Sequence, residues 1–299
     1  MEATGSRLIQ YGNKSAEFTL TPIADIHWGN AACCTELFRY DMKKIAEDPY
    51  TLWLIAGDYI DWITFDDKRF DPATIPDDFR VKDFARFGAK LIAGLLETMT
   101  PAKNTCLGVG YGNHDYRYMS RTGALNLHDL MCEKLESQNL MYSSLMNVYF
   151  EHCPNLKKPK VIKTPKSEQL RKPGQVLLRV AVSHGYGAAQ TAGGKMMALK
   201  RFADLLHDRD LAIMGHLHEQ ISKVFPRMGA DDLCEHIEET CCQVLMTGSY
   251  FRTYQSGMSS YGEMKGFAPA VLGATKARFI PCQRKLVVET QTHNVGKMF

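Results

Sequence analysis

The sequence contains no apolar run that approaches the roughly 20 residues of a membrane-spanning helix. Its first ten residues, Met1 to Gln10, also lack the apolar core of a secretory signal peptide. The first absence excludes a protein that crosses a membrane by helices, and we expect no membrane partner. Together the two absences predict a cytoplasmic location.

No C-x-x-C pair occurs among the nine cysteines, and their number is odd. Two adjacent pairs, Cys33-Cys34 and Cys241-Cys242, have a poor geometry for a disulfide framework. We therefore expect reduced, mostly buried thiols, as in cytosolic proteins. Zinc binding by cysteine is the alternative.

The chain also has little net charge, +3 from 36 basic and 33 acidic residues, too little to indicate a nucleic-acid partner. Its 299 residues are 45% hydrophobic and 23% charged, which is ordinary for a globular protein with a sizeable core. There is no internal repeat and no long polar linker. We expect a single domain over residues 1–299, with a basic loop insertion at about 153–175.

Short apolar runs alternate with segments of helical periodicity through most of the chain. We expect strands at 18–24, 52–56, 105–109, 176–182, 211–214, 243–247 and 286–289. The expected helices cover 35–47, 81–99, 124–137 and 195–207, and 66–78 is expected to be a loop. This alternation predicts an α/β domain with a largely parallel or mixed sheet.

Five polar clusters each follow one of these strand-like runs. The clusters contain Asp25 and His27, Asp58, then Asn113 with His114 and Asp115, then His184, and finally His216 with His218. Because sites in α/β sheets form beyond the carboxyl ends of strands, we expect the five clusters to meet in one site.

The clusters offer carboxylate, amide and imidazole ligands without a thiolate. Asp25 and His27 are two residues apart, so at a strand end they point the same way and can hold one ion together, and His216 and His218 repeat this spacing. Such ligands suit manganese, iron, zinc, nickel or cobalt. Taken alone, each cluster has an ordinary explanation, such as a turn at Gly57-Asp58. Five clusters in this order favour a metal site.

The ordered set resembles the calcineurin-like metallophosphoesterase superfamily, whose pattern is D-x-H, G-D, G-N-H-[DE], H and G-H-x-H. Every signature position is present between Asp25 and His218, which is most of the chain. The resemblance implies a layered α/β/β/α sandwich that holds two divalent transition metal ions at one edge, with manganese expected first.

The resemblance also implies a role for each residue. One metal is expected on Asp25, His27 and His218, the second on Asn113, His184 and His216, and Asp58 is expected to bridge them. Two such cations share a hydroxide that attacks the phosphorus in line. His114 is expected to be the catalyst that stabilises the transition state or protonates the leaving oxygen, with Asp115 orienting it. A solvated or capping aspartate is the alternative for Asp115.

Residues beside the motifs bear on the substrate. Trp62 stands where phosphoprotein phosphatases have a phosphate-binding arginine, and Trp28 replaces a glycine, although Arg117 is kept. Because a dianionic monoester favours bidentate arginine donors, these changes favour phosphodiester hydrolysis, as in the nuclease and phosphodiesterase branch with its phage-encoded members. Phosphomonoester or phosphoprotein hydrolysis is the alternative, and a non-catalytic scaffold is a third.

Candidate substrate contacts are Arg117, Trp28 and Arg252. The aromatic side chains near the motifs either stack on a base or line and support the pocket. The basic loop, with seven lysines and arginines between Lys157 and Lys172, either follows a phosphate backbone or is a solvated insertion. We expect DNA, RNA or a nucleotide as substrate, and the sequence leaves the oligomeric state open.

Overall fold

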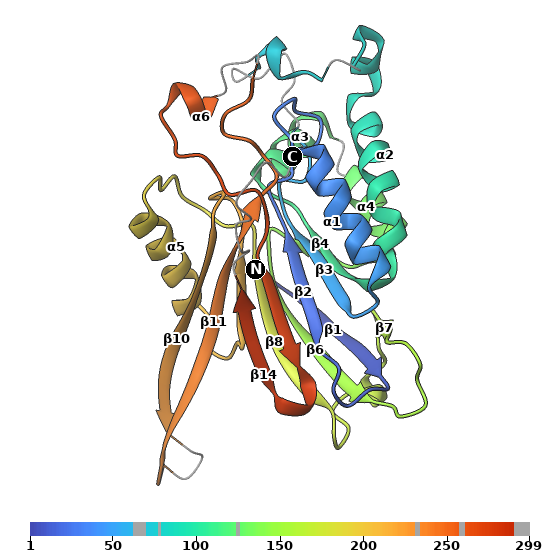
Figure 1. Ribbon diagram of the computed structural model, residues 1–299, viewed down its shortest axis with the longest axis vertical. Coiled ribbons are helices and arrows are strands. Elements are labelled where there is room, and N and C mark those ends of the chain that lie inside the picture. Colours follow the sequence, from blue (N-terminus) through green and yellow to red (C-terminus); the bar gives the residue numbers. More distant parts are fainter. Residues whose placement is uncertain (62–69, 77–78, 124–125, 231–233, 257–260, 290–299) are drawn as a thin grey trace.

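The computed structural model describes residues 1–61, 70–76, 79–123, 126–230, 234–256 and 261–289. Two β-sheets pack face to face, and helices cover the outer face of each sheet (Figure 1). This confirms the predicted layered α/β/β/α arrangement. Among the described residues, no helix is long and apolar enough to cross a membrane.

The smaller sheet carries the first three polar clusters. Its six strands run in the order β14-β13-β2-β3-β4-β5. Neighbours from β2 to β5 are parallel, so their carboxyl ends share one edge. The bounds are β2 (Phe18–Ile23), β3 (Thr51–Ala56), β4 (Cys106–Gly110), β5 (Asn139–Met141), β13 (Lys276–Ile280) and β14 (Lys285–Glu289).

The larger sheet has eight strands in the order β10-β11-β9-β8-β6-β1-β7, with β12 paired to β11. The last two polar clusters follow the ends of β8 and β9, which are parallel neighbours. The bounds are β1 (Glu2–Tyr11), β6 (Ser143–His152), β7 (Lys160–Ile162), β8 (Val176–Ser183), β9 (Leu211–Met214), β10 (Gln220–Ala230), β11 (Ile237–Ser249) and β12 (Gly273–Ala274).

Three apolar clusters hold the layers together. One joins the helices α1, α2 and α4 to the smaller sheet, a second fills the space between the sheets, and a third joins α5 to the larger sheet. Strand β3 is buried on both faces, which explains its continuous apolar sequence. The α-helices are α1 (Thr35–Glu47), α2 (Phe87–Met99), α3 (Asn113–Thr122), α4 (Asn126–Lys134), α5 (Ala192–Asp204) and α6 (Tyr261–Met264).

Most sequence predictions agree with these elements, and α1 has the predicted bounds. The helix predicted over 81–99 is a 3₁₀ turn, η2 (Val81–Arg86), followed by α2. Other short 3₁₀ turns are η1 (Pro72–Thr74), η3 (Thr100–Thr105), η4 (Ser167–Gln169) and η5 (Pro281–Gln283). All nine cysteines lie in the described residues and none forms a disulfide.

Candidate metal centre

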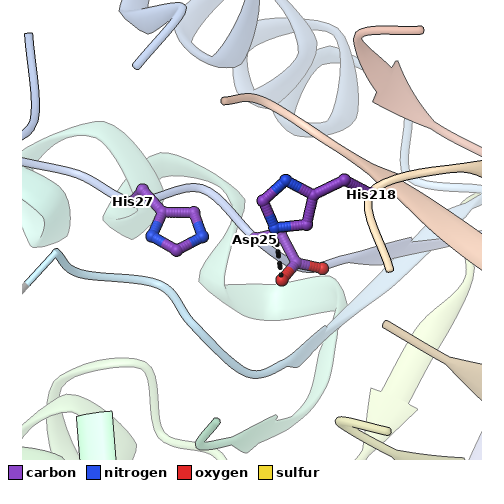
Figure 2. Close-up of side chains that lie close together, drawn as sticks. All are labelled: Asp25, His27 and His218. Atoms are coloured by element: carbon purple, nitrogen blue, oxygen red, sulfur yellow. Dashed lines mark ion pairs between the residues drawn. The ribbon is translucent and has the colours of Figure 1, made fainter. Parts of the chain in front are cut away.

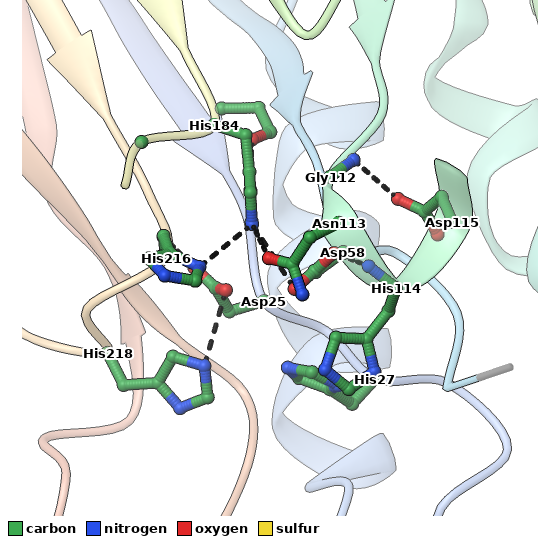
Figure 3. A network of polar contacts seen from close by, with 12 residues as sticks. Asp25, His27, Asp58, Gly112, Asn113, His114, Asp115, His184, His216 and His218 are labelled. Carbon is green, nitrogen blue, oxygen red and sulfur yellow. Dashed lines mark hydrogen bonds and ion pairs between the residues drawn. The ribbon is translucent and has the colours of Figure 1, made fainter. Parts of the chain in front are cut away.

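The five predicted polar clusters lie together at one edge of the sandwich (Figure 3). Each begins within three residues of the end of a strand, namely β2, β3, β4, β8 and β9. The predicted residues that the structure brings together are Asp25, His27, Asp58, Asn113, His114, Asp115, His184, His216 and His218.

The backbone of this region is held in an uncommon conformation. Asp25, His27 and Asp58 have φ angles of 51°, 51° and 47°, and His216 and His218 have 73° and 49°. A side chain at positive φ costs about 1–3 kcal/mol, and such strain collects at functional sites. Backbone bonds hold the loops after β2 and β3 in register, including Asp25 N–H to Gly57 O at 3.1 Å.

One group of lone-pair atoms consists of Asp25, His27 and His218, which come from two distant loops (Figure 2). Nε2 of His218 lies 3.2 Å from Oδ1 of Asp25. Oδ1 of Asp25 and Nε2 of His27 are buried, and neither accepts nor donates a hydrogen bond among the described residues. Since buried polar atoms are normally satisfied, these two atoms fit a bound cation.

A second group consists of Asp58, His184 and His216, with the amide of Asn113 beside it. Nε2 of His184 lies 3.2 Å from Oδ2 of Asp58, 3.1 Å from Oδ1 of Asn113 and 3.3 Å from Nδ1 of His216. Four atoms that can each offer a lone pair therefore converge. The predicted role of Asp58 as a bridge between the two groups stays a prediction.

The tautomers explain why these four atoms suit a cation. Nδ1 of His184 lies 2.9 Å from the carbonyl of Ala56, so it carries a hydrogen and leaves Nε2 free to coordinate. Nε2 of His216 is likewise 2.9 Å from the carbonyl of Gly187, so Nδ1 faces the group. A proton on Nε2 of His184 can form hydrogen bonds with only some of the other three atoms, whereas all four atoms can coordinate one divalent cation.

The electrostatics of the site are dominated by buried carboxylates among imidazoles. Burial raises the pKa of Asp58, but His184, His114 and His27 outweigh it and hold that pKa well below the usual range. Burial lowers the pKa of His184, yet Asp58 and Asp25 raise it to about 9. Burial lowers the pKa of His27 and so favours its neutral, ligating form. The arrangement concentrates negative charge that a cation would neutralise.

His114 lies beside His27, with ring centroids 4.8 Å apart, and its backbone N–H donates to Asp58 Oδ1 at 2.9 Å. Its Nδ1 lies 3.1 Å from Oδ1 of Asp61. The Asp61 carboxylate is therefore placed to orient this ring, and the predicted orienting role of Asp115 stays a prediction. The Asp61 carboxylate is also 3.7 Å from Nδ1 of His27 and accepts from the amide of Asn30.

Asp115 fits the capping alternative. Its Oδ2 accepts from Gly112 N–H at 2.8 Å and its Oδ1 accepts from Ile60 N–H at 3.3 Å, which fixes the start of α3 against the loop after β3. The sequence interpretation did not assign a role to Asp61. In the sequence, the only feature that marks Asp61 as a candidate site residue is its position three residues after Asp58.

Two glycines permit the close approach of the loops. A Cβ at Gly57, whose φ is 103°, would lie 2.5 Å from Nδ1 of His184. A Cβ at Gly112 would lie 2.1 Å from Oδ1 of Asp58. Any side chain at either position would displace a member of the second group.

The three predicted substrate contacts are placed differently. Trp28 is 8% exposed and packs against Phe38 in the core, which favours a supporting role over stacking on a base. Arg252 contacts Cys34 and Glu36 at the start of α1. Arg117 is exposed on α3, one turn beyond Asn113. Trp62, the departure from the phosphatase pattern, lies outside the described residues.

The basic segment lies away from this site. It precedes β8, while His184 follows the other end of that eight-residue strand. An eight-residue strand spans about 26 Å, so a direct contact between the segment and a phosphate at the centre is not supported.

No family model matches the chain, and no curated protein matches its sequence. A structural match is the crystal structure of a conserved uncharacterized protein, described as a predicted phosphoesterase, from Streptococcus pneumoniae TIGR4. The match has a TM-score of 0.31 and 11% identity, and it covers 88% of this chain and 82% of that chain. A similarity at this level does not support a function.

Proposed function

We propose that this chain is a metal-dependent phosphoesterase that hydrolyses phosphodiester bonds in nucleic acid or nucleotides. The observation that supports it most is the convergence of five separate loops on these two groups of lone-pair atoms, beside which His27, Asp61 and His114 form a third group. Asp25, His27 and His218 would hold one cation, and Asp58, Asn113, His184 and His216 the other. Bound divalent cations would neutralise the phosphate oxygens and supply hydroxide near neutral pH.

The chain's own contribution to the reaction falls on His114. Because Nδ1 of this ring faces Asp61, Nε2 is the nitrogen left to deliver a proton to the leaving oxygen. The Asp61 carboxylate stabilises the positive charge that the ring carries before this transfer. The side chain of His114 is 17% exposed, whereas that of Asp61 is 5% exposed, so the ring can meet substrate while its partner stays buried.

Phosphomonoester hydrolysis is the second candidate, and one observation favours it. Arg117 lies four residues after Asn113 on α3, so both side chains lie on the same face of the helix. A guanidinium there can bind the terminal oxygens of a monoester.

The two candidates are separated by comparing bis-p-nitrophenyl phosphate with p-nitrophenyl phosphate in the presence of Mn²⁺. We expect a higher kcat/KM for the diester. A strong preference for the monoester would replace the proposal by the second candidate. Calorimetric titration of the metal-free protein with Mn²⁺, Fe²⁺, Zn²⁺, Ni²⁺ and Co²⁺ tests the site itself, and no detectable uptake of any of them would leave only a non-catalytic scaffold.

A further inference from the structure

The basic segment, residues 153–175, carries charge that the proposed active site does not use. It contains seven lysines and arginines and one acid, Glu168, for a net charge of +6. Because the whole chain has a net charge of +3, the rest of the molecule has a net charge of −3. The positive charge of this protein is therefore concentrated in one segment.

Six of the seven cationic side chains are exposed, and none of the six forms an ion pair with a carboxylate among the described residues. Some other surface cations are paired, as Lys200 is with Asp204 at 2.6 Å. Crowded cations without counter-charges repel one another, which a polyanion would relieve. The six are Lys157, Lys158, Lys160, Lys166, Arg171 and Lys172.

The seventh cation, Lys163, anchors the segment instead. Its ammonium is half-buried and donates to the carbonyls of Lys103 at 2.7 Å and Leu135 at 2.8 Å. Strand β7 also pairs with β1, and Gln175 donates to the carbonyl of Gln169 at 2.8 Å. The segment is thus tied to the body of the protein, so a ligand would not have to order it first.

A row of contacts ties two positions of the segment, Lys160 and Lys172, to the larger sheet. Lys160 lies opposite Gln10, and side chains directly opposite one another in a sheet share a face. Gln10 bonds to Glu151, and Glu151 bonds to Gln175. Gln175 in turn accepts from the backbone of Lys172 at 3.1 Å. Figure 1 shows β7 and this loop away from α3, toward the other end of the sandwich.

We propose that these six side chains form a docking surface, the basic edge, for the phosphate backbone of a nucleic acid. Exposed lysine and arginine bind such a backbone without reading its sequence. The inference rests on the proposed function, because it makes a long nucleic acid the substrate. The span of β8, about 26 Å, separates the basic edge from His184. A duplex that rises 3.4 Å per base pair would need at least about eight base pairs to reach both.

The test compares two variants with equal charge. In the first, the six cations of the basic edge are replaced by glutamine. In the matched control, six exposed cations elsewhere are replaced by glutamine: Lys14, Lys43, Lys44, Lys200, Arg201 and Lys285. Binding of a labelled 30-base-pair DNA is measured by fluorescence anisotropy in metal-free buffer. Single-stranded DNA and RNA of 30 nucleotides are tested in parallel to identify the preferred nucleic acid.

We expect the basic-edge variant to bind the 30-mers at least about tenfold more weakly than the wild type. Its salt dependence on duplex DNA should also be shallower, by a slope of about 0.9 for each phosphate that the variant no longer neutralises. The control should lose much less affinity. Equal losses in both variants, or no binding of the wild type to any 30-mer, would overturn the proposal. Stronger binding of the wild type to vesicles with phosphatidylserine would also overturn it.

Hydrolysis separates this inference from the proposed function. Both variants should hydrolyse bis-p-nitrophenyl phosphate at the wild-type rate, while only the basic-edge variant should lose activity on a 30-mer. A wild type inactive on both substrates would contradict the proposed function. Wild-type activity on the small diester, with identical activity of all three proteins on the 30-mer, would contradict only the basic edge.

Discussion

Nδ1 of His114 lies 3.1 Å from Oδ1 of Asp61, and this contact joins the start of α3 to the loop after β3. The same carboxylate is 3.7 Å from Nδ1 of His27. Burial raises the pKa of Asp61, but its contacts with His114 and His27 outweigh burial and lower the pKa, so it stays ionised. One carboxylate therefore orients both the proposed proton donor and a proposed ligand.

Asp61→Asn should reduce kcat by about 10- to 100-fold, because an amide holds the His114 ring less firmly and does not stabilise its charge. His114→Ala should reduce kcat by about 10²- to 10⁴-fold. Steady-state rates on a chromogenic diester give both values. If Asp61 acts through His114, the double variant should be no slower than His114→Ala alone. Additive losses would show that Asp61 acts mainly elsewhere, with His27 as the first candidate.

Gly112→Ala should abolish most of the activity while the protein remains folded. The added methyl group would lie 2.1 Å from Oδ1 of Asp58 and 2.6 Å from its backbone nitrogen, so Asp58 must move. A displacement of about 1 Å in such a site costs roughly 10²-fold in rate. Activity measured together with circular dichroism tests this. The matched control is Gly193→Ala, where no atom lies within 4 Å of the added carbon, and it should retain full activity.

The sequence predicted several of the elements whose residues are buried in a regular pattern, although it missed strand β6, which alternates between buried and partly buried residues. Helix α1 follows from the spacing of Leu37, Phe38, Met42 and Ile45, all of which are buried. Strands β1, β5, β6, β7, β10, β12 and β13 were not predicted. Strand β10 lies at a sheet edge, contains Pro226 and is partly exposed along its length, so it lacks the apolar pattern of a central strand.

The sequence also predicted which residues gather at the site, because each ligand follows a strand and parallel strands end at one edge. The sequence did not reveal which side chains contact and orient these site residues. Asp61 meets His114 because the loop after β3, which has positive φ angles at Gly57 and Asp58, turns toward the start of α3, and no sequence pattern indicates that conformation. Asp115 was expected in that role because it is adjacent to His114; its carboxylate accepts from two backbone N–H groups, and its orienting role stays a prediction.

Metal binding should stabilise the fold, because Asp25 and Asp58 are buried carboxylates in the two ligand groups. A cation at 100 times its Kd should raise the free energy of unfolding by about 2.7 kcal/mol. Thermal unfolding with Mn²⁺ and with EDTA measures this as a rise in Tm. His216→Ala and His218→Ala each remove one proposed ligand from one group. Each variant should therefore show a smaller rise in Tm with Mn²⁺ than the wild type. An unchanged Tm across all metals would contradict the proposed ligand sets.

Asp41 predicts a pH dependence of stability that is separate from the metal centre. Its carboxylate is buried on α1 and accepts from the hydroxyl of Tyr250 at 2.8 Å. Burial raises the pKa of Asp41, and the bond from Tyr250 offsets only part of this. The folded-state pKa thus lies above the unfolded one. The resulting stabilisation is complete below the unfolded pKa and is lost as pH rises through the folded pKa.

Asp41→Asn should therefore raise the Tm relative to the wild type at pH 7, because asparagine keeps an acceptor for Tyr250 without a buried charge. Below about pH 3.9, where the unfolded aspartate is also protonated, the advantage should vanish. Unfolding followed from pH 3.5 to pH 8 measures the difference. Tyr250→Phe serves as the comparison: it removes the bond that favours the ionised carboxylate, so its destabilisation should be greater at pH 7 than at pH 3.5. A Tm difference between Asp41→Asn and wild type that does not change with pH would show that Asp41 has no shifted pKa.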